Sequence, residues 1–273
     1  MFMKRYITLG VWIGLCVCAM AQTPTPVTSV PYFCGFEQRS ENANWVLNRR
    51  GGLGSNIPLP SSWTISSGAK HSGLRGLYIY TTADGGDETV AQYDGSKEVF
   101  TLAEREFSLP VGAYDLAFDW RCLGDTINDA IFVFWAPSST FNNVNSRTTS
   151  TLPTNVSPLT IEGKTYLSGR GSWSQVQTTV NVSSAQNYKL VIAWHNNTTN
   201  TYNPGACIDN VQLQVAESAS DCWKQVSDLT WTQGSAKDVL SWSGSAGATY
   251  DIFYWLEGSI AMDSVMNVTG TSY

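Results

Sequence analysis

The order of apolar and polar residues along the chain predicts β-structure. Residues 113–122 alternate strictly, with Tyr114, Leu116, Phe118 and Trp120 on one face and Asp115, Ala117, Asp119 and Arg121 on the other. This period of two is typical of a strand with one buried face. Residues 129–136 (DAIFVFWA) are apolar on both faces, which predicts a central strand of a sandwich.

Further strand candidates follow at short intervals and are separated by Gly, Asn, Asp and Pro. They are residues 31–37, 63–66, 77–80, 98–102, 174–182, 188–194 and 206–215. Residues 141–158 are polar and without periodicity, and they are predicted to form a long exposed loop. No sustained 3.6-residue apolar stripe follows the N-terminal segment, so the predicted fold class is all-β.

The strand pattern restarts after a linker of small residues at 216–221. Residues 229–231, 239–242 and 250–254 are the new candidates. We find no tandem repeat between the two halves. The sequence therefore predicts two different β domains, over 31–216 and 220–273.

The first 21 residues have the three parts of a secretory signal peptide. Lys4 and Arg5 supply the positive start, residues 6–17 the apolar run, and Ala19-Met20-Ala21 the cleavage site. The apolar run is too short for a membrane anchor, and a Thr/Pro-rich leader at 22–30 follows it, which we expect to be extended and mobile. The chain is therefore expected to be secreted or at the cell surface, with no transmembrane segment after signal removal.

The composition narrows the classes of partner. The formal net charge is −6, with no cluster of Lys and Arg in the mature chain. Binding to nucleic acid or to anionic lipid needs such a cluster, so both are unexpected.

Four segments occur in an order and spacing that resemble one group of secreted proteins. They are CGFEQRSENANW at 34–45, WTISSGAKHSGLRGLYIYTTADGG at 63–86, LPVGAYDLAFDWRCLGDTINDAIFVFWAP at 109–137 and GACIDNVQLQV at 205–215. Together they are similar to the jelly-roll modules of secreted Bacteroidetes-type proteins, akin to MAM and cleaved-adhesin domains. The resemblance implies a jelly-roll β-sandwich over 31–216.

Residues 222–255 resemble the first half of a fibronectin type III domain. Trp242 stands where that family has a core Trp, and residues 250–254 fit its third strand. Such an Ig-like domain of seven strands needs about 100 residues, whereas only those from 220 to 273 remain. We therefore expect an incomplete sandwich, either because the chain is a truncated product or because its C-terminal part is poorly ordered.

Four cysteines remain after the signal peptide: Cys34, Cys122, Cys207 and Cys222. Export permits disulfides, and four cysteines allow three connectivities if all of them pair. The fibronectin resemblance implies that Cys222 is unpaired, because the last strand that carries its partner in related modules is not present.

Motifs of catalysis are missing from the sequence. G-x-S-x-G, H-E-x-x-H and G-x-x-x-x-G-K-[ST] do not occur, and the two histidines, His71 and His195, have no nucleophile context. The acid pairs Asp125/Asp129 and Asp84/Asp87 lie in predicted turns, where Asp is favoured for backbone hydrogen bonding. The chain is therefore not expected to be an enzyme.

Two carboxylates suggest a structural Ca²⁺ site. Glu37 lies on the first predicted strand of the jelly roll and Asp209 on the last, and related jelly rolls place a metal between such positions. Carboxylate oxygens suit Ca²⁺. The alternative is that both side chains accept hydrogen bonds from backbone groups at the strand ends.

Aromatic side chains near strand ends or loops are candidates for sugar binding, since an aromatic face matches the C–H face of a pyranose. The candidate ligand-binding residues are Trp135, Trp173, Trp194 and Tyr202. The alternative for each Trp is core packing, which is the prediction for Trp120 and Trp242.

The function expected from the sequence is a non-catalytic exported adhesion or carbohydrate-binding module. Its partner would be a glycan or a protein of a host or cell surface. The alternatives are an accessory region of a secreted peptidase or glycoside hydrolase whose catalytic domain is absent from this chain, and a structural spacer.

Overall fold

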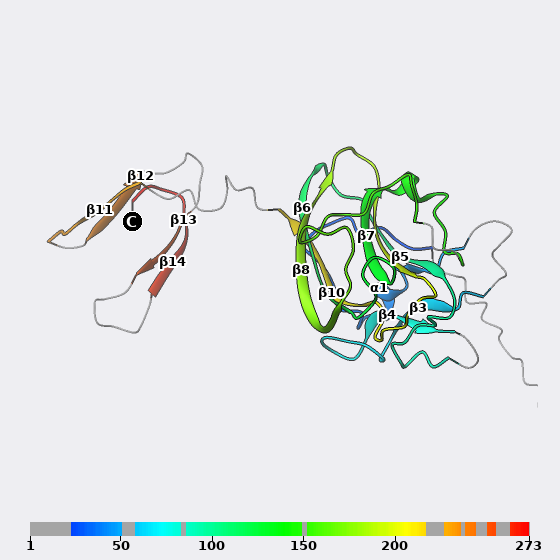
Figure 1. Cartoon of the computed structure of the whole chain (residues 1–273). Helices are drawn as coiled ribbons and strands as arrows, with labels where there is room; N and C mark the ends of the chain where they lie inside the picture. The colour runs from blue at the N-terminus through cyan, green and yellow to red at the C-terminus, as the bar shows by residue number, and fades with distance from the viewer. Residues whose placement is uncertain are drawn as a thin grey trace, which may run out of the picture. The chain divides into compact units, whose positions relative to one another are not determined.

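The structure, a computed structural model, describes residues 23–50, 58–82, 86–148, 152–216, 227–235, 238–243, 250–254 and 263–272. The chain divides into two compact units, Met1–Val215 and Ala216–Tyr273. In both units the regular structure is almost entirely β (Figure 1). The predicted signal peptide and Cys222 lie outside the described residues.

The first unit is a jelly-roll β-sandwich, as predicted. One sheet has the order β3-β4-β10-β6-β8, and β1 also pairs with β10. Its strands are β1 (Tyr32–Cys34), β3 (Ser61–Ser66), β4 (Gly76–Thr81), β6 (Gly112–Cys122), β8 (Arg170–Val182) and β10 (Cys207–Val215). The other sheet has the order β2-β5-β9-β7 and consists of β2 (Val46–Leu47), β5 (Val99–Phe107), β9 (Tyr188–Asn196) and β7 (Ala130–Pro137).

The core lies between the two sheets and follows the predicted alternation of β6. Tyr114, Leu116, Phe118 and Trp120 are all buried in it. The facing sheet contributes the inward positions of β7 and β9, which are Ile131, Val133, Leu190, Ile192 and Trp194. A strand of period two therefore leaves its polar positions on the outer face of its sheet.

Strand β7 lies at the edge of its sheet, which corrects the prediction of a central strand. Phe132 and Phe134 on its outer face are nevertheless buried. Phe141, at the end of the short 3₁₀ helix η2 (Ser138–Phe141), covers them and meets Phe134 edge-on at a centroid distance of 6.4 Å.

The predicted loop over 141–158 has no α-helix or strand in its described residues, but the prediction that it is exposed is wrong for part of it. Phe141 and Val144 are buried against the outer face of the four-stranded sheet, and Leu152 and Val156 pack on the same cluster. These few apolar residues are separated by Ser, Thr and Asn, so no periodicity marks them in the sequence. The segment covers apolar side chains on the outer face of the four-stranded sheet.

The Thr/Pro-rich leader is bound to the sandwich from Thr25 onward, so its predicted mobility is wrong for these residues. The Thr25 N–H donates to Asn44 Oδ1 over 2.9 Å, and the Thr25 carbonyl accepts from Arg105 Nη1 over 2.7 Å. Val27 forms a parallel bridge with Phe107 of β5.

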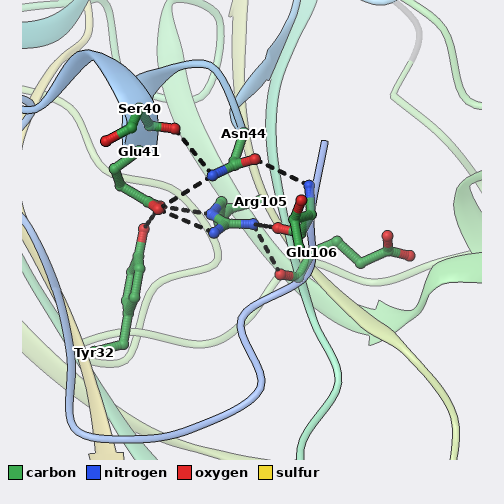
Figure 2. Close-up of polar contacts among 7 residues, drawn as sticks. Tyr32, Ser40, Glu41, Asn44, Arg105 and Glu106 are labelled. Carbon is green, nitrogen blue, oxygen red and sulfur yellow. Dashed lines mark hydrogen bonds and ion pairs between the residues drawn. The ribbon is translucent and has the colours of Figure 1, made fainter. Parts of the chain in front are cut away.

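Arg105 is the centre of this anchoring network (Figure 2). It is 3% exposed, and its Nε and Nη2 donate to Glu41 over 2.7 and 3.2 Å. Glu41 lies in helix α1 (Arg39–Asn42), and its Oε1 also accepts from the Tyr32 hydroxyl over 2.7 Å. One ion pair thus joins β5, α1, β1 and the leader.

We expect Arg105→Met to lower the free energy of unfolding by about 3 kcal/mol, because it leaves the Glu41 carboxylate partly buried without a cation. Thermal or urea unfolding measures the effect. The control is Arg39→Met on the exposed side of α1, which should change the stability by less than about 0.5 kcal/mol. Equal stability of the two variants would contradict the anchoring role.

The cysteines of the first unit are not paired. Cys34, Cys122 and Cys207 are all free thiols and buried, so the expected disulfides are wrong for these three residues. Cys122 packs in the core between the sheets, whereas Cys207 packs on the outer side of its sheet. Burial raises the pKa of the Cys34 and Cys207 thiols to about 11.

We expect these three thiols to be unreactive in the folded protein at pH 8, because they are both inaccessible and protonated. In a chain without residues 1–21 and with Cys222→Ser, a thiol reagent should label none of them before unfolding and all three in guanidinium chloride. Rapid labelling of any of the three in the native protein would show that its burial is wrong.

The second unit consists of two antiparallel pairs in its described residues. Strand β11 (Ser227–Thr232) pairs with β12 (Val239–Ser243), and β13 (Tyr250–Tyr254) pairs with β14 (Asp263–Val268). Trp242 is buried, as predicted, and meets Tyr250 edge-on at 5.3 Å.

The structure contains no helix long and apolar enough to cross a membrane within the residues it describes.

Candidate functional site

The outer face of the six-stranded sheet carries rows of polar side chains. The alternation of β6 turns Asp119 to this face. In the strand register Asp119 lies between Asp209 of β10 and Gln175 of β8. Asp119 and Asp209 are 4% and 0% exposed, so this row places two buried carboxylates directly opposite each other.

A second row contains an exposed aromatic ring. Phe33 of β1 is opposite Gln212 of β10, Gln212 is opposite Ala117 of β6, and Ala117 is opposite Gln177 of β8. The row crosses four strands, roughly 14 Å at the usual strand spacing. Phe33 is 61% exposed. The small side chain of Ala117 leaves space between the two amides.

Phe33 was not among the residues singled out from the sequence. A signal for it is present, because Tyr32 and Cys34 on either side are apolar and face the core, so alternation turns Phe33 outward. A Cβ atom built on Gly35 would lie 3.3 Å from two atoms of the Phe33 ring and 3.3 Å from Asn210 Oδ1. The ring therefore lies over the backbone at Gly35, beside Asn210.

Asp119 links the groups in the middle of this face. Its Oδ2 accepts from His71 Nδ1 and from Asn210 Nδ2, each over 2.7 Å. Asn210 Oδ1 in turn accepts from the Ser72 hydroxyl over 2.9 Å. Asn210 has a φ of +49° at a register shift in β10, a backbone conformation that Asn tolerates better than most residues.

Trp173 completes the face on β8. The His71 ring stacks on it with a centroid distance of 5.4 Å and an interplanar angle of 20°. The guanidinium carbon of Arg121 lies 5.1 Å from the Trp173 centroid. The His71 side chain is 46% exposed, so solvent reaches this end of the face.

Hydrogen bonds and ring stacking join five of these residues, and Phe33 lies beside them over Gly35; we call the set the Phe33–Trp173 strip. It consists of Phe33, His71, Ser72, Asp119, Trp173 and Asn210. Of the four predicted ligand-binding residues, only Trp173 belongs to it.

The two predicted calcium ligands hold the loop that carries His71. Asp209 Oδ2 accepts from the backbone N–H of His71 and Ser72 over 2.7 and 3.0 Å. Glu37 Oε1 accepts from the backbone N–H of Leu74 and Arg75 over 2.8 and 2.9 Å. Both side chains therefore accept backbone hydrogen bonds, which is the alternative to a Ca²⁺ site that the sequence analysis left open.

The described residues do not supply a ready set of ligands for Ca²⁺. No group of three or more His, Cys, Asp or Glu side chains in this part of the chain is arranged to hold a metal. Burial raises the pKa of Asp209, the backbone N–H groups lower it, and Asp119 raises it further. Calcium binding by Glu37 and Asp209 stays a prediction.

Trp194 and Trp135 are not exposed platforms. Trp194 is fully buried, and its Nε1 donates to Asn196 Oδ1 over 2.9 Å, so the prediction of ligand binding is wrong for this residue. Trp135 is partly buried and stacks on Tyr188 at 5.7 Å, and its Nε1 donates to the Asn181 carbonyl over 2.9 Å. Both occupy packing positions, the alternative that the sequence offered.

Tyr202 is 47% exposed on the loop between β9 and β10. Its N–H donates to the Tyr93 hydroxyl over 2.9 Å, which in turn donates to Asp129 Oδ2 over 2.5 Å. Asp129 is fully buried, and burial raises the pKa of its carboxyl. This cluster fixes the loop and is separate from the Phe33–Trp173 strip in the contacts of the described residues.

Comparison with known proteins gives structural neighbours only. No protein-family model and no curated protein sequence matches the chain. A CBM61 module in complex with β-1,4-galactotriose shares 12% identity over 63% of this chain and 88% of that chain, with a TM-score of 0.35.

Two xylan-binding domains are similar to the same extent. The CBM22-1 domain of Paenibacillus barcinonensis Xyn10C shares 9% identity over 71% of this chain and 99% of that chain, with a TM-score of 0.37. The xylan-binding domain of CBM 22, formally x6b, shares 12% identity over 69% of this chain and 96% of that chain, with a TM-score of 0.39. Similarity this low leaves the functional argument to the residues of this chain.

We expect Asp209→Asn to destabilise the first unit by about 1–3 kcal/mol, because an amide cannot accept all three backbone bonds that Asp209 accepts and leaves a buried donor unpaired. Asp115→Asn is the matched control, since Asp115 lies on the same face of β6 and binds only the exposed Thr179 hydroxyl. Thermal melting measures both.

Melting of the wild-type protein with Ca²⁺ and with EDTA tests the predicted metal site. If the melting midpoint is the same in both conditions, calcium binding is refuted.

Proposed function

We propose that this protein is a non-catalytic carbohydrate-binding module that binds a glycan along the Phe33–Trp173 strip. One observation carries the proposal. The sheet face carries the exposed phenyl ring of Phe33 beside Asn210 on one side, and on the other the His71–Trp173 stack, which Asp119 joins to Asn210.

Sugar chemistry fits this combination of groups. The C–H face of a pyranose packs on an aromatic face, and Phe33 offers such a face to solvent. Hydroxyl groups need both donors and acceptors, and the amides of Gln175, Gln177 and Gln212 provide both on the same sheet face. The Phe33 row is long enough for more than one sugar ring.

A binding role fits better than a catalytic one. His71 Nδ1 and Asp119 are paired as the base and orienting carboxylate of a hydrolase are paired. The hydroxyl of the adjacent Ser72, however, donates to Asn210 rather than to His71. The His71–Asp119 pair therefore serves to fix the imidazole against Trp173.

The setting of this module is part of the proposal. The signal-like N-terminus and the resemblance to MAM and cleaved-adhesin jelly rolls support a role outside the cell, in adhesion to a glycan or to a glycan-bearing surface protein. The resemblance of the second unit to a fibronectin type III domain supports a spacer function for it. An accessory role beside a catalytic domain would use the same glycan contact.

A glycan array with the wild-type protein tests the function, followed by affinity measurements on the best ligand. We expect Phe33→Ala and Trp173→Ala each to weaken binding about tenfold, the loss that corresponds to about 1.4 kcal/mol of buried aromatic contact. The control is Trp231→Ala, an aromatic residue 64% exposed in the second unit, which should leave binding unchanged.

Tyr202→Ala distinguishes the strip from the loop site that the sequence suggested. Binding lost in Tyr202→Ala and kept in Phe33→Ala would move the site to the loop between β9 and β10. An array without any bound glycan would refute carbohydrate binding.

A further inference from the structure

Arg121 lies on the outer face of the six-stranded sheet, beside the Phe33–Trp173 strip, and no carboxylate pairs with it among the described residues. It lies on β6 opposite Cys207 of β10, whose buried and uncharged thiol forms a side-chain hydrogen bond with it. Its guanidinium carbon is 5.1 Å from the centroid of Trp173. Its Nε is buried without a hydrogen-bond acceptor, and Arg121 forms no ion pair with any residue that the structure describes.

Other arginines of the same unit are neutralised when they leave the solvent. Arg105 is paired with Glu41, and Arg49 with the buried Glu104, each over 2.7 Å. Partial burial of a guanidinium costs free energy when no carboxylate pairs with it, and a buried N–H without an acceptor adds to that cost. Arg121 is therefore a group for which an acceptor from outside the chain would be favourable.

Asp119, an acid on the same face of β6, does not fill this role. Asp119 precedes Arg121 by two residues on β6, so both side chains point outward. Asp119 Oδ2 accepts from His71 and Asn210, and these two donors hold it toward β10 and the His71 loop. The charge of Arg121 thus stays available beside Trp173.

A second arginine lies at the same end of the β6–β8 ladder, but on the other side of the sheet. Arg170 of β8 is opposite Cys122, the residue after Arg121, and it is exposed. Its Nη1 donates to the Ser174 hydroxyl. Because Cys122 and Trp120 face the core side of the sheet, Arg170 lies on that side as well, with its guanidinium carbon 5.5 Å from the centroid of Trp120. The positive charge on the outer face here therefore comes from Arg121 and not from Arg170.

We infer that the strip is selective for acidic glycans, and that Arg121 binds the carboxylate of a uronic acid whose ring lies against the His71–Trp173 end. The inference rests on the proposed function and names its ligand class. A planar guanidinium matches a planar carboxylate with two parallel hydrogen bonds, and a neutral hexose offers no such partner. Phe33 and the amide row would then hold the adjoining sugars.

The test compares a galacturonate trisaccharide with its methyl ester, which has the same sugar rings and no charge. We expect the wild-type protein to bind the acid at least about tenfold more tightly than the ester in calorimetry at low salt, as a charged hydrogen-bonded pair provides. Arg121→Gln should remove this preference and leave the affinity for the ester unchanged. Arg121→Lys should retain part of it.

Arg147→Gln is the matched control, because Arg147 also lies over an aromatic ring, 5.6 Å from the centroid of Phe100, away from the strip. It should keep the wild-type preference for the acid. The comparison of acid and ester on the wild-type protein needs no variant, so it decides the matter even if Arg121→Gln fails to fold.

Equal wild-type affinity for acid and ester would overturn the inference, and Phe33-dependent binding of the ester would then leave the proposed function standing. An equal loss of both ligands in Arg121→Gln would make Arg121 a structural support of Trp173 and would also overturn it. Binding of neither ligand, together with a negative array, would refute the proposed function itself.

Discussion

Strand β10 must form hydrogen bonds on both of its edges, and the first unit is arranged around that requirement. Strand β6 pairs along one edge, while β4 pairs with the start of the other edge and β1 with its later part. The change of partner falls at the register shift that follows Asp209. Because the backbone leaves its regular course there, Asp209 and Asn210 meet the His71 loop instead of another strand. The groups of the Phe33–Trp173 strip are collected at this irregularity.

The two outer faces of the sandwich differ in how far they are covered by other segments. On the four-stranded sheet, Arg49 pairs with Glu104 and also donates to the carbonyls of Phe141 and Val144, which fixes the covering segment in place. That face is a second core. On the six-stranded sheet the outward positions of β6, β8 and β10 include Asp, Arg and Gln, and Phe33 and Gln177 in the row across these strands are exposed. This second face combines the exposed Phe33 ring and the partly buried Trp173 ring with polar groups along several strands.

The sequence predicts those parts of the fold that depend on local period. The strict alternation of β6 is reproduced residue by residue, and Trp120 and Trp242 are buried as predicted. It fails where burial depends on distant segments. The covering segment with Phe141 has no periodic pattern of its own. Trp194 stands near the end of an apolar strand, and nothing near it in the sequence shows that distant segments bury it. Trp173 was found by its residue type, but its neighbours His71 and Asn210 come from loops and a bulge that only the tertiary structure places.

The ladder between the first and last strands of the sandwich has a kinetic consequence. Tyr32 is opposite Leu213, so this pairing closes a loop of nearly the whole unit. Such distant contacts form slowly, because the entropy of closing the chain is lost before any contact compensates for it. Phe33 and Asn210 meet only when β1 and β10 have come together. The strip cannot exist in a partly folded chain, so the ability to bind along it would report that the whole sandwich has closed.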